Sequence, residues 1–405
     1  MKNLVIPCLL LLLASCTKSF NEKQYSSPPA TEVVKESCGF GITEFNTVKR
    51  PASFGEANKG KPGGGGGNGG GGGTTGGGGT TGGGGGTTSS TANVIFLDFN
   101  GHYTANTMWN TSGPFTCTPA NLTAEEITLI TQRVIADFTP FNITITTDET
   151  VFNAANSTKR MRVVITESYE WYGMAGGVSF LNSFTWGDGT PAFVFSSLLG
   201  YDVKKIAEAT SHEAGHTLGL RHQSTYDANG IKTSDYNWGQ GSGEIGWAPI
   251  MGAAYNENLS LWHKGPNSIS ATTIQDDVAQ IASVVGLVAD EFSNTTSGST
   301  SLTSSKTGII NNSTDIDYFS LNINTTKTLS LVPANVGPNN EGSNLDLVLK
   351  IYNNQGALIS TVNDPMILNA GVSMAPGNYY VSASTTDNQY TSKYGMLSKY
   401  IISIN

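Results

Sequence analysis

Apolar residues follow strand and helix spacing in turn from residue 93 onward. The run 94–97 is entirely apolar and has the length of a strand. Thr123 and Glu126 then form the pattern of a capping box, and a helix-spaced apolar set follows them: Ile127, Ile130, Val134 and Phe138. This pattern predicts a buried strand followed by an amphipathic helix.

Further strands and helices are predicted before residue 291. Strands are expected over 141–146, 162–166, 176–180 and 192–196. A long helix is expected over 201–220 with Asp202 as its N-cap, and a shorter helix over 277–288. Strands interleaved with long helices predict a mixed α/β (α+β) domain over residues 92–291.

The pattern changes near the C-terminus. Residues 292–306 are rich in Ser and Thr and are interpreted as a linker. In residues 307–405, short alternating stretches recur between turn residues, which is typical of an all-β sandwich.

The N-terminal residues are interpreted as a targeting signal. Residues 1–15 combine a positive start with an apolar run that is too short to span a bilayer. The run ends in Leu13-Ala14-Ser15-Cys16, which resembles the lipobox of bacterial lipoproteins, so lipidation of Cys16 is expected. Acyl chains there would hold the protein at a membrane. The alternative is an ordinary signal peptide with a chance Cys.

Two segments without a predicted core follow the signal. Residues 16–62 are polar and are interpreted as a stalk or a pro-segment. Residues 63–91 are dominated by Gly and Thr and are interpreted as a flexible linker. The chain carries 31 acidic against 22 basic residues, a net charge of −9, which argues against a nucleic-acid partner.

The segment HEAGHTLGLRH contains the candidate metal-binding and catalytic residues. His212 and His216 are four apart, so on a helix their imidazoles share one face and can grip one Zn²⁺. Glu213 can reach a zinc-bound water without ligating the metal. Gly219 can break the helix and let His222 turn back as a third ligand. Three His ligands leave a position for water, which is typical of catalytic zinc.

This segment resembles the metzincin clan of zinc metalloendopeptidases. The resemblance implies a twisted mixed sheet, an active-site helix, an irregular part after Gly219, and a turn with a Met beneath the metal, for which Met251 is the candidate. It also implies an edge strand that pairs with extended substrate, with these candidates: Gly177, Val178, Ser179 and Phe180. Gln223, after the third His, does not match the astacin, serralysin, adamalysin or matrixin signatures, and Ala253 stands where astacins and serralysins place a ligand Tyr, so the branch stays open.

The sequence therefore predicts a lipid-anchored zinc metalloendopeptidase. It would hydrolyse peptide bonds of protein or peptide substrates through a zinc-bound water, with Glu213 as general base. Its place would be extracytoplasmic, in a bacterial cell envelope or released to the exterior. A surface adhesin with a vestigial protease domain, and a protease specialised for one partner, remain alternatives.

Several residues keep more than one interpretation. Cys38 could be a thiolate switch on the zinc, a disulfide partner of Cys117, or an idle thiol. Asp276 and Asp277 could touch a Ca²⁺ ion, although capping of the following helix is favoured. The segment 315–319 (DIDYF) resembles the bacterial pre-peptidase C-terminal domain, which implies a jelly-roll sandwich with an accessory role in solubility, maturation, or docking to matrix or glycan. The alternative is a plain spacer domain.

Overall fold

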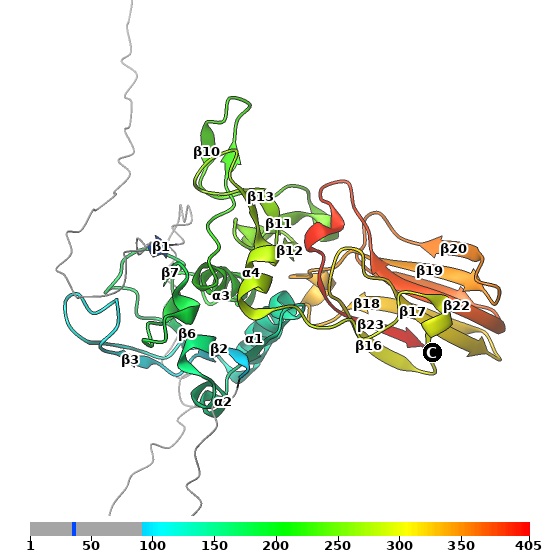
Figure 1. The fold of residues 1–405 in the computed structure, drawn as a ribbon, viewed down its shortest axis with the longest axis horizontal. Helices are drawn as coiled ribbons and strands as arrows, with labels where there is room; N and C mark the ends of the chain where they lie inside the picture. The colour runs from blue at the N-terminus through cyan, green and yellow to red at the C-terminus, as the bar shows by residue number, and fades with distance from the viewer. Residues whose placement is uncertain (1–34, 38–90) are drawn as a thin grey trace, which may run out of the picture. The chain divides into compact units, whose positions relative to one another are not determined.

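The computed structural model describes residues 35–37, as backbone, and residues 91–405 (Figure 1). The predicted signal 1–15, Cys16, Cys38 and the Gly/Thr-rich tract lie outside the described residues, apart from residue 91 of that tract. Within the described part, no helix combines the length and the apolar character needed to cross a membrane.

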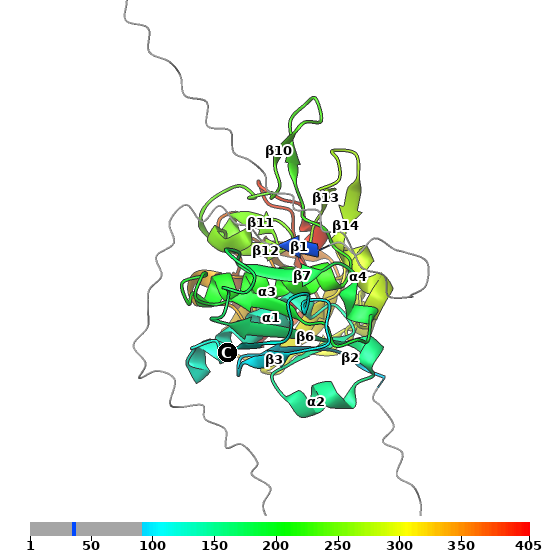
Figure 2. The same cartoon turned by 90° about the vertical axis from the view of Figure 1, so that its left-hand side faces the viewer.

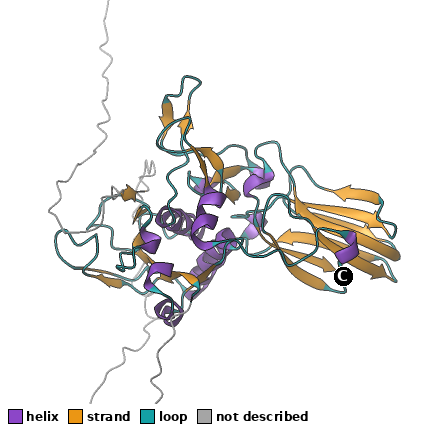
Figure 3. Cartoon of the chain, in the orientation of Figure 1, coloured by secondary structure: helices purple, strands orange, loops and turns teal. Residues whose placement is uncertain are grey.

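A six-stranded mixed sheet organises the first half of the described chain (Figure 3). Strands β2, β5, β6 and β8 run parallel, whereas β7 pairs antiparallel with β8 and β1 antiparallel with β7. The strand order is β1 (Lys35–Ser37), β7 (Gly177–Phe180), β8 (Ala192–Phe195), β6 (Arg160–Thr166), β2 (Asn93–Asp98), β5 (Ile143–Thr146). All the strands predicted from sequence before residue 200 are present.

Both faces of this sheet are covered, which explains why β2 is an unbroken apolar run. Ile95 and Leu97 pack in the main core with residues of α1 (Ala124–Phe138) and α3 (Val203–Thr217). Val94 and Phe96 point to the other face and pack with Phe152 of α2 (Glu149–Ala154). Strands buried on both sides lose the polar alternation of half-exposed strands.

The helices begin where their caps predict. The Thr123 side chain accepts from Glu126 N and the Glu126 side chain accepts from Thr123 N, which completes the capping box of α1. Asp202 caps α3 through Lys205 N at 3.0 Å. Asp276 caps α4 (Asp277–Val285) through Ala279 N at 3.0 Å.

The chain between α3 and α4 is irregular. Its strands are only two or three residues long: β9 (Thr225–Tyr226), β10 (Lys232–Ser234), β11 (Trp247–Pro249), β12 (Leu259–Leu261), β13 (Lys264–Pro266) and β14 (Ile274–Asp276). A hairpin of β3 (His102–Thr104) and β4 (Phe115–Cys117) lies before α1 in sequence.

The C-terminal part consists of two antiparallel-rich sheets that share one hydrophobic core, drawn in yellow to red in Figure 1. One has the order β15 (Thr300–Ser301), β17 (Asp317–Ile323), β22 (Gly377–Thr385), β19 (Leu347–Asn353), β20 (Leu358–Val362). The other has the order β16 (Ser305–Ile310), β23 (Ser398–Ile404), β18 (Lys327–Pro333), β21 (Ala370–Met374). We call this part the sandwich.

The segment predicted as a linker is partly built into the sandwich. Within 292–306, Thr300–Ser301 pairs in parallel with β17 and Leu302 is buried in the sandwich core. The sequence interpretation of this stretch as a plain linker is therefore wrong in its second half, because one buried Leu and a strand pairing outweigh its Ser/Thr-rich composition.

Side chains of the sandwich also reach the α/β part. Ser398 Oγ donates to the Ala136 carbonyl at 2.8 Å, and Asn344 Nδ2 donates to Asp137 Oδ1 at 2.8 Å. Residues Leu259 and Ser343 form a parallel bridge. The contact between the two parts thus combines buried hydrogen bonds with an apolar cluster, in which Leu259 and Leu261 pack with Leu368 and Met396.

Candidate metal centre

The structure brings the three predicted histidines together. His212 and His216 lie on one face of α3, and the loop after the helix carries His222 to them. The ring centroids are 4.7 Å apart for His212 and His216, 4.8 Å for His216 and His222, and 5.1 Å for His212 and His222. One nitrogen from each ring lies within 4.8 Å of the other two, so the group could hold a metal ion.

The return of His222 depends on how α3 ends. The helix stops at Thr217, and Gly219 adopts a φ of +100°, a region that side chains with a Cβ rarely adopt. A Cβ at Gly219 would also lie 2.6 Å from Asn182 Oδ1. Both the backbone angle and the space therefore require Gly at this turn.

Backbone carbonyls fix the orientation of two rings. His212 Nδ1 donates to the Ile250 oxygen at 2.7 Å, and His216 Nδ1 donates to the Leu220 oxygen at 2.6 Å. These bonds place the proton on Nδ1, which leaves Nε2 as the ligating atom. The Nε2 atoms of His216 and His222 are buried and have no hydrogen-bond partner among the described residues.

Burial also keeps the imidazoles neutral. It lowers the pKa of His212 to about 4 and holds the pKa values of His216 and His222 well below their usual value. Metal binding requires neutral imidazole, so these rings need not lose a proton at neutral pH. Buried nitrogens without partners, three neutral imidazoles and carbonyl-fixed tautomers all fit Zn²⁺.

Glu213 lies directly beside the histidines and is fully buried. Ser179 Oγ donates to Glu213 Oε2 at 2.6 Å. The predicted edge strand, Gly177 to Phe180, is β7, and all four of its residues are buried. Its outer neighbour is β1, which pairs Lys35 with Phe180 and Ser37 with Val178 (Figure 2). The strand expected to pair with substrate is thus paired with the chain's own N-terminal region.

Met251 lies in a turn after β11 and packs against α3. It is fully buried, and a Cβ at Gly215 would meet its Sδ at 2.5 Å. Its carbonyl accepts from Gln223 N at 2.7 Å, which ties the turn to the residue after His222. The structure therefore joins the Met turn to both the helix and the third histidine.

Tyr236 is a neighbour of the centre that the sequence analysis missed. Its buried ring lies 4.5 Å from the His222 ring and 6.4 Å from the His212 ring. Tyr255, the Tyr nearest Met251 in sequence, packs instead against the main hydrophobic core. No spacing marks Tyr236, because the irregular loop that brings it to the centre has no periodic pattern.

The two candidate calcium carboxylates are engaged with protein groups. Asp276 caps α4, and Asp277 Oδ1 accepts from Gln223 Nε2 at 3.0 Å and Gln275 Nε2 at 2.9 Å. Another acidic group has its oxygens within 4.8 Å of one another, at the start of the sandwich: Asp290, Asp315 and Asp317. Burial raises the pKa of Asp315 to about 6 and that of Asp317 to about 8.

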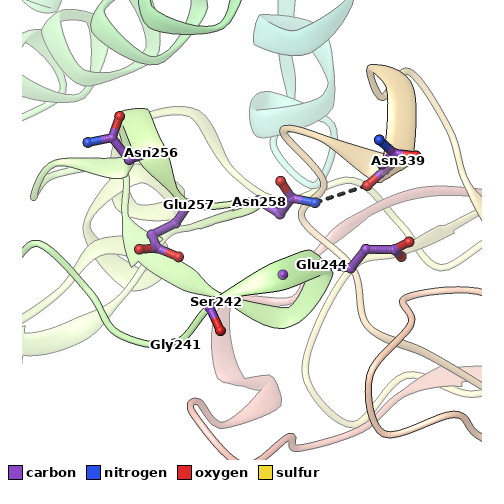
Figure 4. A pocket seen from close by; sticks show the side chains of 8 residues that line it. Gly241, Ser242, Glu244, Asn256, Glu257, Asn258 and Asn339 are labelled. Atoms are coloured by element: carbon purple, nitrogen blue, oxygen red, sulfur yellow. Dashed lines mark hydrogen bonds between the residues drawn. The ribbon is translucent and has the colours of Figure 1, made fainter.

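A separate polar pocket of about 520 Å³ lies where the irregular region meets the sandwich (Figure 4). Asn258 Nδ2 donates to the Asn339 oxygen across it at 2.9 Å. None of the residues predicted to act in catalysis or metal binding lines it. Its lining residues are Gly241, Ser242, Gly243, Glu244, Asn256, Glu257, Asn258 and Asn339.

Comparison with known proteins gives limited similarity. No family model matches the chain, and no curated protein matches it. A pre-peptidase C-terminal domain of a Bacillus anthracis collagenase is similar over 26% of this chain and 91% of its own, at 13% identity and a TM-score of 0.19. A periplasmic inhibitor of g-type lysozyme from Aeromonas hydrophila is similar over 26% of this chain and 96% of its own, at 11% identity and a TM-score of 0.17. The structure itself shows mixed sheets with few helices, a β-rich C-terminal part, and a His triad that could hold a metal ion.

Proposed function

We propose that the protein is a zinc-dependent, metzincin-like metalloendopeptidase, exported and anchored to a membrane through lipid on Cys16. The observation that carries this proposal is the convergence of His212, His216 and His222 on one buried point with Glu213 beside it. Three imidazoles hold a zinc ion while leaving a coordination position open, and a carboxylate that is not a ligand suits proton transfer.

Different residues of the chain have different roles in the proposed peptide hydrolysis. A bound zinc would supply Lewis acidity that activates water and polarises the scissile carbonyl. Glu213 takes a proton from the attacking water and delivers it to the leaving amine. The carbonyls of Ile250 and Leu220 keep the imidazoles turned toward the metal.

Strand β7 supports a peptide rather than a small-molecule substrate. It is the second strand of the sheet, and the edge that it turns away from β8 accepts an antiparallel strand, namely β1. An extended peptide that displaced β1 would pair through its backbone, a recognition mode that imposes little sequence preference.

The alternative of an adhesin with a vestigial protease domain makes a different prediction. The complete set of three histidines with Glu213 beside them speaks against an adhesin with a vestigial site. A sandwich that contacts glycan or matrix protein is compatible with both a peptidase and an adhesin. The two functions are therefore distinguished by measuring zinc content and peptide hydrolysis.

The experiment compares Glu213→Ala and His216→Ala with the full-length protein. Glu213→Ala should retain zinc but lose about 100- to 10,000-fold in the rate of casein hydrolysis. His216→Ala should lose the zinc itself, whereas the control His102→Ala should change neither quantity. Zinc is measured by elemental analysis. A metal-free, inert wild-type protein, or a Glu213→Ala variant with wild-type activity, would contradict the proposal.

A further inference from the structure

The two faces of β7 have different environments. Val178 and Phe180 pack in an aromatic cluster with Trp109. The alternate residues face α3, because a Cβ at Gly177 would lie 2.7 Å from Glu213 Cγ and Ser179 Oγ is bonded to Glu213. The strand that would bind substrate on its edge therefore contacts the general base with one of its faces.

Ser179 and Gly177 both lie against the Glu213 side chain. Ser179 Oγ donates to Oε2 at 2.6 Å, and both residues are fully buried. Oε1 lies next to Gly177, where a Cβ would come within 2.8 Å of it. A buried hydrogen bond to a carboxylate is among the stronger ones, so it holds the side chain in one orientation.

A second bond ties the end of β7 to the same helix. Asn182 N donates to the His216 carbonyl at 3.0 Å, two residues beyond the strand. The side-chain bond at Ser179 and this backbone bond lie on either side of Phe180 and Leu181. The position of β7 is therefore coupled to the helix that carries Glu213 and two of the histidines.

We propose that Ser179 is a positioning residue, which holds the Glu213 carboxylate at the place where it transfers protons. This inference rests on the proposed peptidase function and adds a specific role to a residue expected only to pair with substrate. Ser179 acts through Glu213 and not through the substrate side chains, so its loss should impair turnover more than substrate binding.

The kinetic test uses Ser179→Ala, with Ser196→Ala as a matched control. Ser196 is also fully buried at the end of a strand, but its Oγ donates to the Ala120 carbonyl at 2.8 Å. Ser179→Ala should lower kcat about 10- to 100-fold, as is usual for residues that orient an active-site group, with zinc content unchanged and KM within about twofold. Ser196→Ala should leave kcat near the wild-type value. Equal kcat values for the two variants would overturn the inference.

A second test measures the melting temperature and does not depend on enzymatic activity. In metal-free protein, Ser179→Ala should lower the melting temperature, and by a smaller amount when Glu213 is already Ala, because the acceptor is then absent. Ser196→Ala should lower it equally in both backgrounds. Additive effects of Ser179→Ala and Glu213→Ala would count against the coupling. An inert wild-type protein contradicts the peptidase proposal, whereas a Ser179→Ala variant with the kcat of an active wild-type protein contradicts only this inference.

Discussion

The His triad depends on neighbouring residues that have no metal-binding chemistry of their own. Gly219 lets the chain turn after α3, and the carbonyls of Ile250 and Leu220 orient two imidazoles. Gly215 lies between the two helical histidines, and a Cβ there would meet Met251. The geometry of the centre is therefore set as much by close packing behind the helix as by the ligands.

Replacement of Gly215 by Ala tests this packing. The added methyl would meet Met251 Sδ at 2.5 Å, so we expect overpacking that costs about 1–3 kcal/mol of stability. The melting temperature should fall, and zinc affinity should fall with it because either α3 or the Met251 turn, which is bonded to Gln223 beside His222, must shift. In a Met251→Ala background the cost should shrink. An identical cost in both backgrounds would show that the two side chains do not oppose each other.

Residue spacing predicted some of these neighbours and not others. The intervals between His212, His216, Gly219 and His222 predicted the three-ring cluster because a helix followed by a sharp turn has few geometries. Ser179 and Tyr236 reach the centre through tertiary contacts. No local period relates them to the histidines, so no sequence pattern predicts their contacts with the centre.

Among the elements, the N-termini of the helices were the most predictable features, whereas the ends predicted at 220 and 288 lie beyond the last residues of α3 and α4, Thr217 and Val285. The Thr123 capping box and the Asp202 cap each satisfy backbone N–H groups that the helix cannot, and the structure uses both. Strand β20 is harder to predict from the sequence. Strand β20 is largely exposed at the edge of its sheet, so it lacks the buried alternation that marks other strands.

The pairing of β1 with β7 leads to a prediction at the level of the element. If substrate pairs with β7, residues 35–37 compete with it for the same edge. In an antiparallel pair only alternate residues hydrogen-bond to a given neighbour, and proline removes that donor. A single-proline scan of Lys35, Glu36 and Ser37 should therefore raise kcat/KM in an alternating pattern, by about fivefold where one bond of about 1 kcal/mol is lost.

The scan has an internal control. A residue whose backbone N–H points away from β7 loses no hydrogen bond to that strand, so proline at this position should change kcat/KM least. Hydrolysis is measured on a fluorogenic peptide with the full-length chain, and zinc content is compared across the three variants. Equal rates for all three variants and the wild type would show that β1 does not compete with substrate.

At the scale of the whole molecule, the sandwich and the α/β part are joined more closely than the sequence suggested. The Ser/Thr-rich composition of 292–306 predicted two separately tethered domains. Instead, Asn344 of the sandwich is buried against Asp137 of α1, and Arg133 of α1 pairs with Glu341 at 2.7 Å. Such contacts join residues far apart in sequence, so neither composition nor periodicity reveals them.

The buried carboxyl of Asp137 makes this junction sensitive to pH. Asp137 accepts from Ser211 Oγ at 2.5 Å and Asn344 Nδ2 at 2.8 Å, yet burial, with the nearby Glu208, raises its pKa to about 8. Between about pH 4 and pH 8 the folded protein holds a proton that the unfolded chain releases. The contribution of Asp137 to stability is therefore present in acid and is lost as the pH rises through this window.

Asp137→Asn removes this titration, because an amide stays neutral at every pH. The free energy of unfolding of the wild type should fall more steeply from pH 5 to pH 8 than that of the variant, by up to about 1.4 kcal/mol per pH unit. Denaturant titrations in the presence of a chelator measure both curves without a contribution from metal binding. Asp364→Asn, at an exposed position of the sandwich, should keep the wild-type slope. Parallel curves for the wild type and Asp137→Asn would mean that Asp137 is ionised in the folded protein, and its bonds to Ser211 and Asn344 would then outweigh its burial.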